Sequence, residues 1–308
     1  MSLSRRDVLA MSTAAVAASA LPPASAAEPA EPFGYSFNTS TVRGQKLPVE
    51  EIAKLAAKAG YQGIEPWITE LQDYTKRGGH LKDLGKLLAD LGLKVESAIG
   101  FAKWIVDDEL ERQKGLDEAK RDMEMVAAVG GKRIAAPPAG ATDKHMAELG
   151  VIADRYRALA ELGAKFGLVP EAEVWGFSKT MSRLGEAVLV AMESGHPRAC
   201  VLPDVFHLYK GGSGYGGLRL LSGQAIGIFH VNDYPKDKDR AFIKDADRVF
   251  PGDGVAPLAE VFRTLRDIGY RGMVSLELFN PEYYKRDAYE VVKTGLDKTR
   301  AAVKAAHG

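Results

Sequence analysis

The sequence is short of several features, and each shortage excludes a class of protein. One cysteine, Cys200, is present among 308 residues, so no disulfide bond can form within the chain. Lys and Arg together number 41, as do Asp and Glu, so there is no basic excess for binding nucleic acid. No apolar run reaches the length of about 20 residues that a membrane-spanning helix needs. With 46% hydrophobic and 27% charged residues, the composition is that of a soluble globular protein.

The N-terminus has the pattern of an export signal. Arg5 and Arg6 precede a modest apolar stretch at 8–21, and a small-residue cleavage site ends at Ala26. We interpret residues 1–26 as a twin-arginine signal peptide, which predicts a periplasmic protein that is not inserted in the membrane after cleavage. The alternative is an uncleaved N-terminus with two chance arginines. Residues 27–32, rich in Pro, Ala and Glu, are a predicted linker.

From residue 33 onward, predicted strands alternate with predicted helices. Gly residues end most of the helices, and an apolar run follows each of them. Eight strands are predicted, at 35–41, 63–67, 94–99, 133–136, 169–173, 199–203, 226–230 and 273–277. Eight is the number in a (β/α)8 TIM barrel, so we predict an α/β fold with a single barrel domain over residues 33–308. A doubly wound open sheet is the rival, but the stretch SFNTSTVRGQKLP lacks the Gly-rich fingerprint of such folds.

Two segments far apart in the chain share one pattern. AKLAAKAGYQGIEPW and RTLRDIGYRGMVSLE both consist of a helix, Gly-Tyr-x-Gly, a strand and an acid. Repeated helix–Gly–strand units are typical of (β/α)8 chains. Glu65, the acid of the first copy, is a candidate substrate-binding residue.

Four predicted strands end in an acid or a histidine. These residues are Glu173, Asp204, His230 and Glu277. The carboxyl ends of barrel strands meet at one face, where this donor set favours a divalent metal ion. Taken singly, each residue has a structural explanation: a core histidine, an ion-paired glutamate or a helix-capping aspartate. Glu171 shares a strand face with Glu173, and we prefer Glu173 because it lies nearer the end of its strand. His207, three residues after Asp204, is predicted to lie over the site without binding the metal.

The loops that follow the strands supply candidate substrate contacts. The three tryptophans are Trp67, Trp104 and Trp175. Each lies at or just after a predicted strand end, where it either stacks on a sugar ring or packs a loop onto the barrel. The loop from 231 to 256 is long and charged, and long loops inside compact domains are usually functional. Within it, Lys236 and Arg240 are candidates for binding an anionic or hydroxyl-rich substrate; the alternative is a solvated charged loop.

Several segments resemble the xylose isomerase-like TIM barrels, often called sugar phosphate isomerases/epimerases. They are EVWGFS, DVFHLYKGG, FHVNDYP, RVFPGDG and GYRGMVSLELFNPEY, and the resemblance extends from residue 33 to the end. It implies that Glu173, Asp204, His230 and Glu277 bind one divalent ion, commonly manganese, cobalt, magnesium or zinc. It also implies that His207, in the D-x-x-H pair, contacts a substrate oxygen. In the ketose 3-epimerase branch an Arg lies six residues beyond the metal His, whereas this chain has Lys236. The export signal is a second departure, because the sugar-metabolism members are cytosolic.

Such a site implies proton transfer at a carbon next to a carbonyl. The metal polarises the carbonyl and its neighbouring hydroxyl, one carboxylate removes the proton, and a second can return one on the opposite face. We assign these two roles to Glu173 and Glu277, with a small-molecule sugar or keto-sugar derivative as substrate. The same first step serves isomerisation, epimerisation or, if a β-hydroxyl leaves, dehydration by a lyase. The sequence does not choose among these, nor does it show whether the chain forms a homo-oligomer.

Two rival functions come from other classes. Endonuclease IV-like enzymes share the barrel but use a His-rich three-zinc site on abasic DNA, whereas this chain has six His and a balanced charge. The second rival is a carbohydrate-binding barrel without catalytic activity, which would exchange no carbon-bound proton. We therefore predict a metal-dependent sugar isomerase or epimerase with no nucleic-acid partner.

Overall fold

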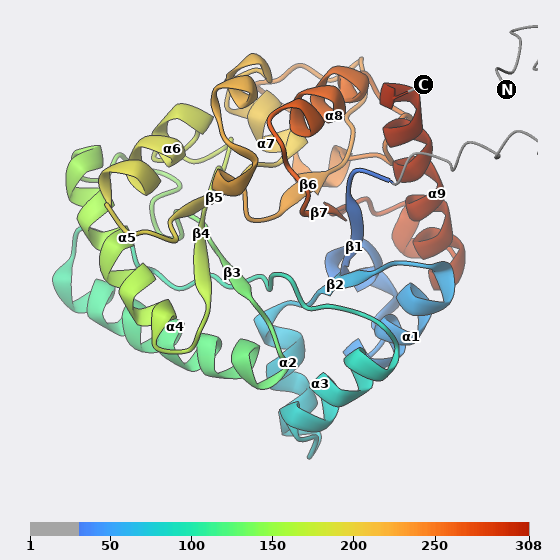
Figure 1. Ribbon diagram of the computed structural model, residues 1–308, viewed down its shortest axis with the longest axis horizontal. Helices are drawn as coiled ribbons and strands as arrows, with labels where there is room; N and C mark the ends of the chain where they lie inside the picture. Colours follow the sequence, from blue (N-terminus) through green and yellow to red (C-terminus); the bar gives the residue numbers. More distant parts are fainter. Residues whose placement is uncertain (1–30, 308) are drawn as a thin grey trace, which may run out of the picture. The chain divides into compact units, whose positions relative to one another are not determined.

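Parallel strands surrounded by helices make up residues 31–307, the part of the chain that the computed structural model describes (Figure 1). The strands are β1 (Gly34–Asn38), β2 (Gly63–Glu65), β3 (Arg133–Ala136), β4 (Val169–Glu173), β5 (Cys200–Leu202), β6 (Phe229–Val231) and β7 (Met273–Leu276). The α-helices are α1 (Val49–Ala59), α2 (Ile68–Lys76), α3 (Leu81–Asp90), α4 (Glu109–Ala128), α5 (Leu149–Ala164), α6 (Leu184–Glu193), α7 (Val205–Lys210), α8 (Leu258–Asp267) and α9 (Ala288–His307). The predicted signal at 1–26 and most of the predicted linker lie outside the described residues.

The strands form two parallel sheets that are bridged into a ring. One sheet has the order β2-β1-β7-β6 and the other the order β3-β4-β5. On one side isolated parallel bridges join the sheets directly, pairing Val201 with Ile226 and Asp204 with His230; on the other side they pair Gly63 with Lys94 and Trp67 with Ile99 of the segment 94–99, which lies between the sheets. The order of the strands around this ring follows the order of the chain, and the helices lie outside it (Figure 1). This is the single (β/α)8 barrel that the sequence predicts.

The predicted third strand, 94–99, differs from the expectation. It takes its place in the ring between β2 and β3, but it is held by two isolated bridges, from Lys94 to Gly63 of β2 and from Ile99 to Trp67 beyond the end of β2. Pro66 lies between these two bridges and has no N–H to donate, so no continuous ladder connects them. The segment is held on its other side by β3, where the Ala135 N–H donates to the Ala98 carbonyl at 2.9 Å.

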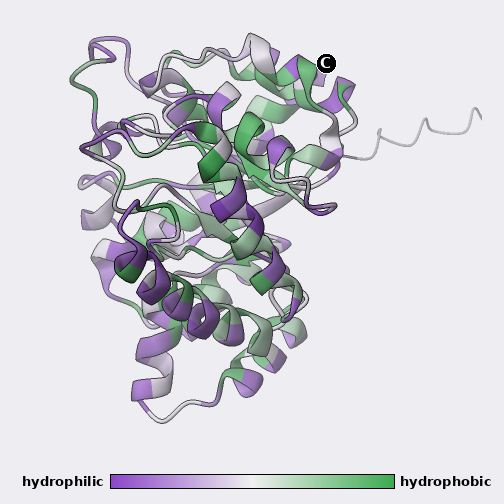
Figure 2. Cartoon of the chain, turned by 90° about the vertical axis from the view of Figure 1, so that its left-hand side faces the viewer, coloured by the Kyte–Doolittle hydropathy of each residue, from purple (hydrophilic) through white to green (hydrophobic). Residues whose placement is uncertain are grey.

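The helices bury one face each against the barrel. In α1 the buried side chains include Ile52, Ala53, Ala56 and Ala59, which recur at helical spacing. The helix ends at Gly60, which has a φ of 103° and donates its N–H to the carbonyls of the last turn, a conformation that glycine adopts without strain. Figure 2 shows both kinds of residue on the same helices, hydrophilic on one side and hydrophobic on the other. Accordingly, no helix in the described part of the chain is long and apolar enough to cross a membrane.

Two helices were not predicted, α2 and α7. Both follow a strand almost directly, and α7 is six residues long, too short for a hydrophobic period to be recognised in the sequence. Both begin at the carboxyl end of a strand, so they start next to the face on which the predicted site residues lie.

Candidate active site and metal centre

Asp204, His230 and Glu277 meet at the carboxyl ends of β5, β6 and β7. One potential ligand atom from each side chain lies within 4.8 Å of the other two, and all three side chains are buried. Asp204 lies just beyond β5, His230 within β6 and Glu277 directly after β7. The parallel barrel thus brings together residues that are far apart in the sequence.

His230 directs one ring nitrogen at this cluster. Its Nδ1 lies 3.2 Å from Glu277 Oε2 and 3.8 Å from Asp204 Oδ2, and its Nε2 lies 2.9 Å from Glu65 Oε2. Nδ1 is buried and makes no hydrogen bond. A carboxylate on Nε2 holds the ring proton there, so Nδ1 presents its lone pair to the cluster. An unpartnered buried nitrogen beside two carboxylates fits a divalent cation, whose usual ligands include these groups.

Glu65 lies behind His230, and this corrects its predicted role as a substrate contact. It is fully buried, and its Oε2 accepts hydrogen bonds from Asn38 Nδ2 at 2.9 Å and from Ser275 Oγ at 2.8 Å. The same Asn38 amide also donates to Glu277 Oε1 at 3.1 Å. With its oxygens used by these neighbours, Glu65 orients His230, and Asn38 connects Glu65 with Glu277. Asn38 was not predicted as a site residue, although it too is a polar residue at the end of an apolar strand.

Glu173, the fourth predicted ligand, lies outside the 4.8 Å grouping but next to it. It is 4% exposed at the end of β4, and burial raises the pKa of its carboxyl well above the ordinary value, against the opposing effect of His230. Repulsion from Glu277 and Asp204, which lie near it, raises this pKa further. Glu171, the alternative on the same strand face, instead accepts a hydrogen bond from Ser97 Oγ at 2.6 Å.

Asp204 has two roles because its two oxygens point in different directions. Oδ1 accepts the N–H of His207 at 2.8 Å and so caps the N-terminus of α7. Oδ2 accepts a hydrogen bond from Asn232 Nδ2 at 2.8 Å and lies on the side of His230. The capping explanation and the ligand explanation are therefore compatible, and Asn232 keeps the second oxygen in place.

His207 lies over the cluster as a neutral imidazole. Burial lowers its pKa to about 3. Its Nδ1 is 3.3 Å from the N–H of Gly176, and its Nε2 is 3.1 Å from Arg248 Nη2. A neutral imidazole accepts a hydrogen bond on one nitrogen and carries a proton on the other. In one of these two contacts, therefore, an N–H of the imidazole faces another N–H donor. A substrate oxygen between His207 and Arg248 would remove that conflict.

Arg248 is a site residue that the sequence analysis did not single out. Its side chain is 1% exposed and donates to Asp204 Oδ2 at 3.0 Å, Glu277 Oε2 at 2.9 Å and Asp245 Oδ1 at 2.6 Å. Arg248 lies in the motif RVFPGDG, whereas the spacing from His230 indicates Lys236. The long loop after β6 thus supplies a guanidinium to the cluster from further along the chain.

The loop that carries Arg248 is fixed by one carboxylate. Asp233 accepts the backbone N–H groups of Gly252, Gly254 and Ala256 at 2.8–3.1 Å. Backbone hydrogen bonds of 3.0 and 2.9 Å also pair Asp233 with Val249, directly beside Arg248. Asp233 therefore determines where the guanidinium stands.

Lys236 and Arg240 lie elsewhere on this loop. Both are exposed, and the Arg240 carbonyl accepts a hydrogen bond from Lys210 Nζ at 3.0 Å. The structure does not bring either residue into the cluster of Asp204, His230 and Glu277.

Aromatic side chains line part of the same face. We call the row of Phe279, Trp67, Phe101, Trp175 and Phe177 the aromatic arc. Successive ring centroids in it are 6.0, 5.1, 5.9 and 5.1 Å apart. At one end Phe177 lies 5.3 Å from the His207 ring. Trp67 and Trp175 were predicted from the sequence, and the three phenylalanines were missed because single aromatic residues in loops carry no distinctive pattern.

Trp104, the third predicted tryptophan, is part of the core. It is 1% exposed, its indole N–H donates to the Pro137 carbonyl at 2.9 Å, and its ring packs 5.8 Å from that of Tyr156. The predicted substrate contact is therefore wrong for Trp104, and the alternative, a tryptophan that packs a loop onto the barrel, is correct.

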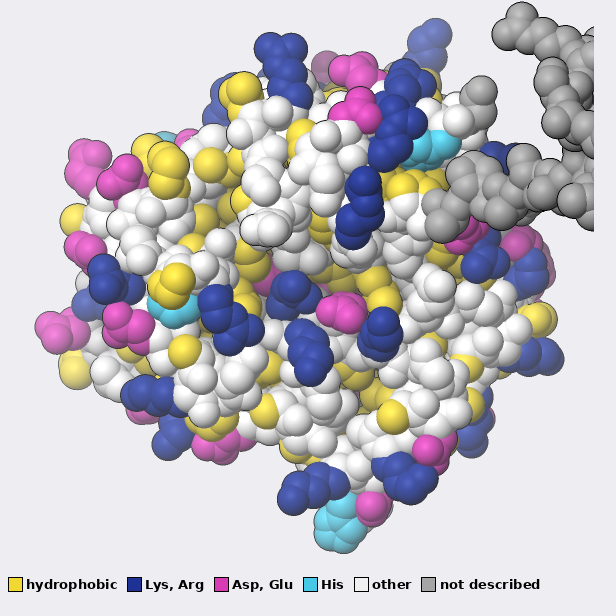
Figure 3. Space-filling view, in the orientation of Figure 1, with side chains coloured by type: hydrophobic (Ala, Val, Ile, Leu, Met, Phe, Trp, Pro, Cys, Tyr) yellow, Lys and Arg dark blue, Asp and Glu magenta, His cyan; other side chains and the backbone are white. Residues whose placement is uncertain are grey.

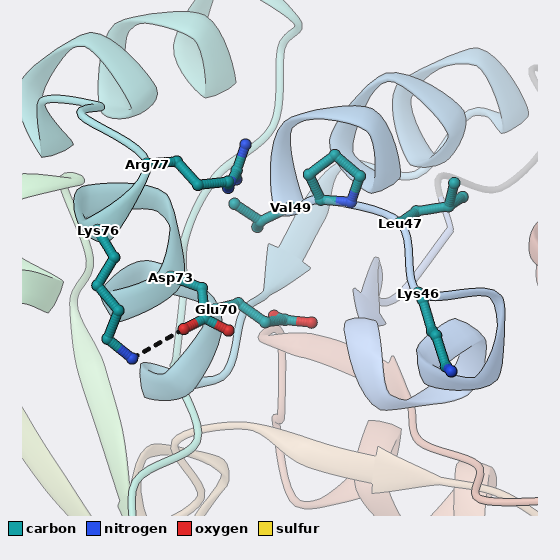
Figure 4. A pocket seen from close by; sticks show the side chains of 8 residues that line it. Lys46, Leu47, Val49, Glu70, Asp73, Lys76 and Arg77 are labelled. Carbon is teal, nitrogen blue, oxygen red and sulfur yellow. Dashed lines mark hydrogen bonds and ion pairs between the residues drawn. The ribbon is translucent and has the colours of Figure 1, made fainter.

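A separate surface cavity lies between α1 and α2 (Figure 4). It has a volume of about 490 Å³, and its charged lining residues are largely paired: Lys76 with Asp73 at 3.0 Å, and Arg77 with Glu50 at 2.7 Å. Glu70, also in its wall, accepts the N–H of Trp67 at 2.9 Å. Because its charges neutralise one another and none of its lining residues belongs to the carboxylate–histidine cluster, we place the active site at the cluster.

Comparisons with known proteins agree with this geometry. Residues 53–302 match the family described as xylose isomerase-like TIM barrel. An inosose isomerase of Bacillus velezensis is 28% identical over 271 residues, covering 87% of this chain and 96% of that protein. A 3-dehydroshikimate dehydratase of Pseudomonas putida is 25% identical over 237 residues, covering 75% of this chain but 36% of that protein. A solved structure described as IOLI protein with a binding zinc atom has a TM-score of 0.82 and 27% identity, covering 88% of this chain and 98% of that one.

Proposed function

Since the chain belongs to the xylose isomerase-like TIM barrel family, we propose that it is a metal-dependent isomerase or epimerase that moves a proton next to the carbonyl of a sugar or keto-sugar derivative. The observation that carries this proposal is the convergence of Asp204, His230 and Glu277, with an unpartnered His230 Nδ1 among them. The inosose isomerase, a relative along nearly its whole length, supports a cyclic polyol or sugar ketone as the class of substrate.

One divalent ion, drawn from manganese, cobalt, magnesium and zinc, would be held by Asp204, His230 and Glu277, with Glu173 as the fourth ligand. When bound, it supplies positive charge that stabilises the negative oxygen of an ene-diolate. Metal analysis of the purified protein should give one ion per chain. We expect this ion to be lost in His230→Ala, and the same content in wild type and variant would exclude His230 as a ligand.

The chain's own residues divide the remaining work. Arg248, whose Nη1 lies 2.9 Å from Glu277 Oε2, opposes the effect of burial and lowers the pKa of Glu277, whereas burial raises the pKa of Glu173. Two carboxyl groups with such different pKa values suit a proton donor and a proton acceptor. Glu277 takes the proton from carbon and Glu173 returns one, while His207 and Arg248 hold the substrate oxygens.

Deuterium incorporation tests the reaction type. Ketoses, aldoses, inososes and 3-keto-glycosides would be incubated with metal-loaded enzyme in D2O and followed by NMR. Deuterium at the carbon next to the carbonyl, without loss of water, is the expected result. Glu277→Gln should lower the exchange rate at least about 100-fold, as expected for loss of a catalytic base. The exposed residue Glu282, changed to Gln, is the matched control.

A dehydratase is the second candidate, favoured by the 3-dehydroshikimate dehydratase among the relatives. It shares the first proton abstraction and differs in the loss of a β-hydroxyl, which the same NMR spectra report. Absence of exchange with every substrate would favour a carbohydrate-binding barrel without catalytic activity. An endonuclease IV-like activity has less support, since Lys, Arg, Asp and Glu side chains are interspersed on the face shown in Figure 3.

The location of the protein is a further part of the proposal. Arg5 and Arg6 before an apolar stretch support export by the twin-arginine route to the periplasm. Replacing both by Lys should retain the protein in the cytoplasm, as measured by cell fractionation, and undiminished export would contradict the proposal.

A further inference from the structure

The aromatic arc exposes rings that a purely structural cluster would bury. Phe101 and Phe177 are each 37% exposed, and Trp67 and Trp175 are half-buried. Trp104 gives the contrast, because it packs in the core with 1% exposure. Large apolar side chains that remain exposed next to one another mark a binding surface.

The arc is longer than one sugar ring requires. Its centroid-to-centroid steps, from 5.1 to 6.0 Å, are each comparable to the width of a single six-membered ring. The interplanar angles from Trp67 through Phe101 and Trp175 to Phe177 are 43°, 44° and 38°, so each ring is tilted against its neighbour, and together the rings form an apolar wall. A monosaccharide within reach of the carboxylates would leave part of this wall without a contact.

The two tryptophans of the arc are linked to the proposed acid and base. The Trp67 indole N–H donates to Asn38 Oδ1 at 2.9 Å, and Asn38 in turn donates to Glu277 at 3.1 Å. Trp175 follows Glu173 by two residues, directly beyond the carboxyl end of β4. The sugar ring that reacts therefore lies near both tryptophans.

Phe101 stands between these tryptophans, 5.1 Å from Trp67 and 5.9 Å from Trp175. Its side chain has no polar atom to guide a reacting group. On the far side, Arg43 stacks on Trp67 with its Cζ 3.7 Å from the ring centroid. The apolar wall that remains open therefore runs from Phe101 over Trp175 to Phe177.

From these contacts we infer that the open part of the arc binds a planar, apolar substituent of the substrate. On the proposed function, this makes the substrate a glycoside-like keto-sugar that carries an aromatic group, and not a free monosaccharide. The substituent lies against Phe101, Trp175 and Phe177, and the reacting ring lies over the carboxylates. Offset and edge-on contacts between tilted rings favour an aromatic group over an aliphatic one of the same size.

Binding of matched glycosides tests the inference without requiring turnover. Phenyl and methyl β-glycosides of glucose, galactose and xylose would be titrated into the purified protein by calorimetry. We expect the phenyl compound of at least one pair to bind about tenfold more tightly, as several aromatic contacts would give. Phe101→Leu and Phe177→Leu keep apolar volume but remove a ring, and each should reduce this preference to below about threefold.

Phe242→Leu is the matched control, because Phe242 is 78% exposed and lies outside the arc. Equal affinity for phenyl and methyl compounds in all three pairs, no detectable binding of any of them, or an equal loss of preference in Phe242→Leu would overturn the inference. A phenyl preference without deuterium exchange would contradict the proposed function and leave the aromatic subsite standing. Deuterium exchange on free sugars without a phenyl preference would support the proposed function and overturn the aromatic subsite.

Discussion

Replacing Glu65 by Gln tests whether the residue behind His230 controls metal binding. The substitution keeps the size of the side chain but turns one acceptor oxygen into an N–H donor. In the wild type, Glu65 Oε2 lies 2.9 Å from His230 Nε2 and also accepts from Asn38 and Ser275 at 2.9 and 2.8 Å. Gln cannot accept all three hydrogen bonds, so the imidazole loses its fixed tautomer and orientation.

The expected magnitude follows from these contacts. Loss of a partner that orients a metal-binding histidine weakens metal affinity by about 10–100-fold, or roughly 1.4–2.7 kcal/mol. The metal-free variant should also be less stable, because a buried donor left without an acceptor costs about 1–3 kcal/mol. The two effects are separable, since one is seen in the dissociation constant and the other in unfolding of the metal-free protein.

Chelator competition with manganese or zinc measures the affinity, and urea unfolding of the metal-free protein measures the stability. Glu171→Gln is the control, because Glu171 is equally buried in the barrel but accepts from Ser97, outside the cluster. Wild-type affinity in Glu65→Gln, or a larger loss in Glu171→Gln, would refute the assignment of His230 as a ligand oriented by Glu65.

Three further predictions concern groups around the site and in the helical layer. Arg248→Lys should retain the fold but lower the deuterium exchange rate about 100-fold, because one ammonium cannot reach all the carboxylates that the guanidinium binds. An unchanged rate would exclude Arg248 from the mechanism. Asp233→Asn should lower both the exchange rate and the unfolding free energy, the latter by about 1–3 kcal/mol, since the loop carrying Arg248 loses an acceptor; urea unfolding checks this. Burial, with repulsion from Glu118, raises the pKa of Asp122 to about 7 from an ordinary value of 3.8. The folded state therefore favours the protonated acid, and it loses stability as the pH rises from about 4 through 7. Asparagine stays neutral, so Asp122→Asn should be about 2 kcal/mol more stable than wild type at pH 8 and differ little from it at pH 4. This value is about half of what the pKa shift alone would give, because solvent screens the charge. Thermal unfolding measures both proteins, and equal pH profiles would contradict the prediction.

The residues proposed to bind the metal could be predicted because each of them lies at the end of a strand. An apolar strand that stops at an acid or histidine is visible in one sequence, and the barrel topology then places these ends together. Asp204, His230 and Glu277 follow that rule. Arg248 does not, because its position depends on Asp233 and on a loop whose path is fixed by backbone hydrogen bonds. Such bonds leave no periodic signal.

Other differences have equally local causes. Trp104 and Trp175 both follow strand ends, and the sequence does not distinguish them; the difference is that the Trp104 indole finds the Pro137 carbonyl inside the core. The segment 94–99 has a strand-like pattern, but Pro66 interrupts the ladder opposite it. Glu65 lies at the predicted end of its strand, but its carboxylate contacts His230, which lies in front of it, so it orients this histidine.

The balance of buried charge explains why these roles belong together. Glu65, Asp204 and Glu277 are buried carboxylates, and the cations facing them are Arg248 and a protonatable His230. Burying charges without compensation is costly, so this set is best compensated by a cation among its oxygens, with His230 neutral and Nδ1 directed at it. Arg248 is already paired to Asp204, Glu277 and Asp245, so its guanidinium is not free to bind a phosphate on the substrate. A neutral polyhydroxy ketone, held by its oxygens at the cluster and by its apolar part at the aromatic arc, is therefore the ligand that this arrangement of charges and rings suits.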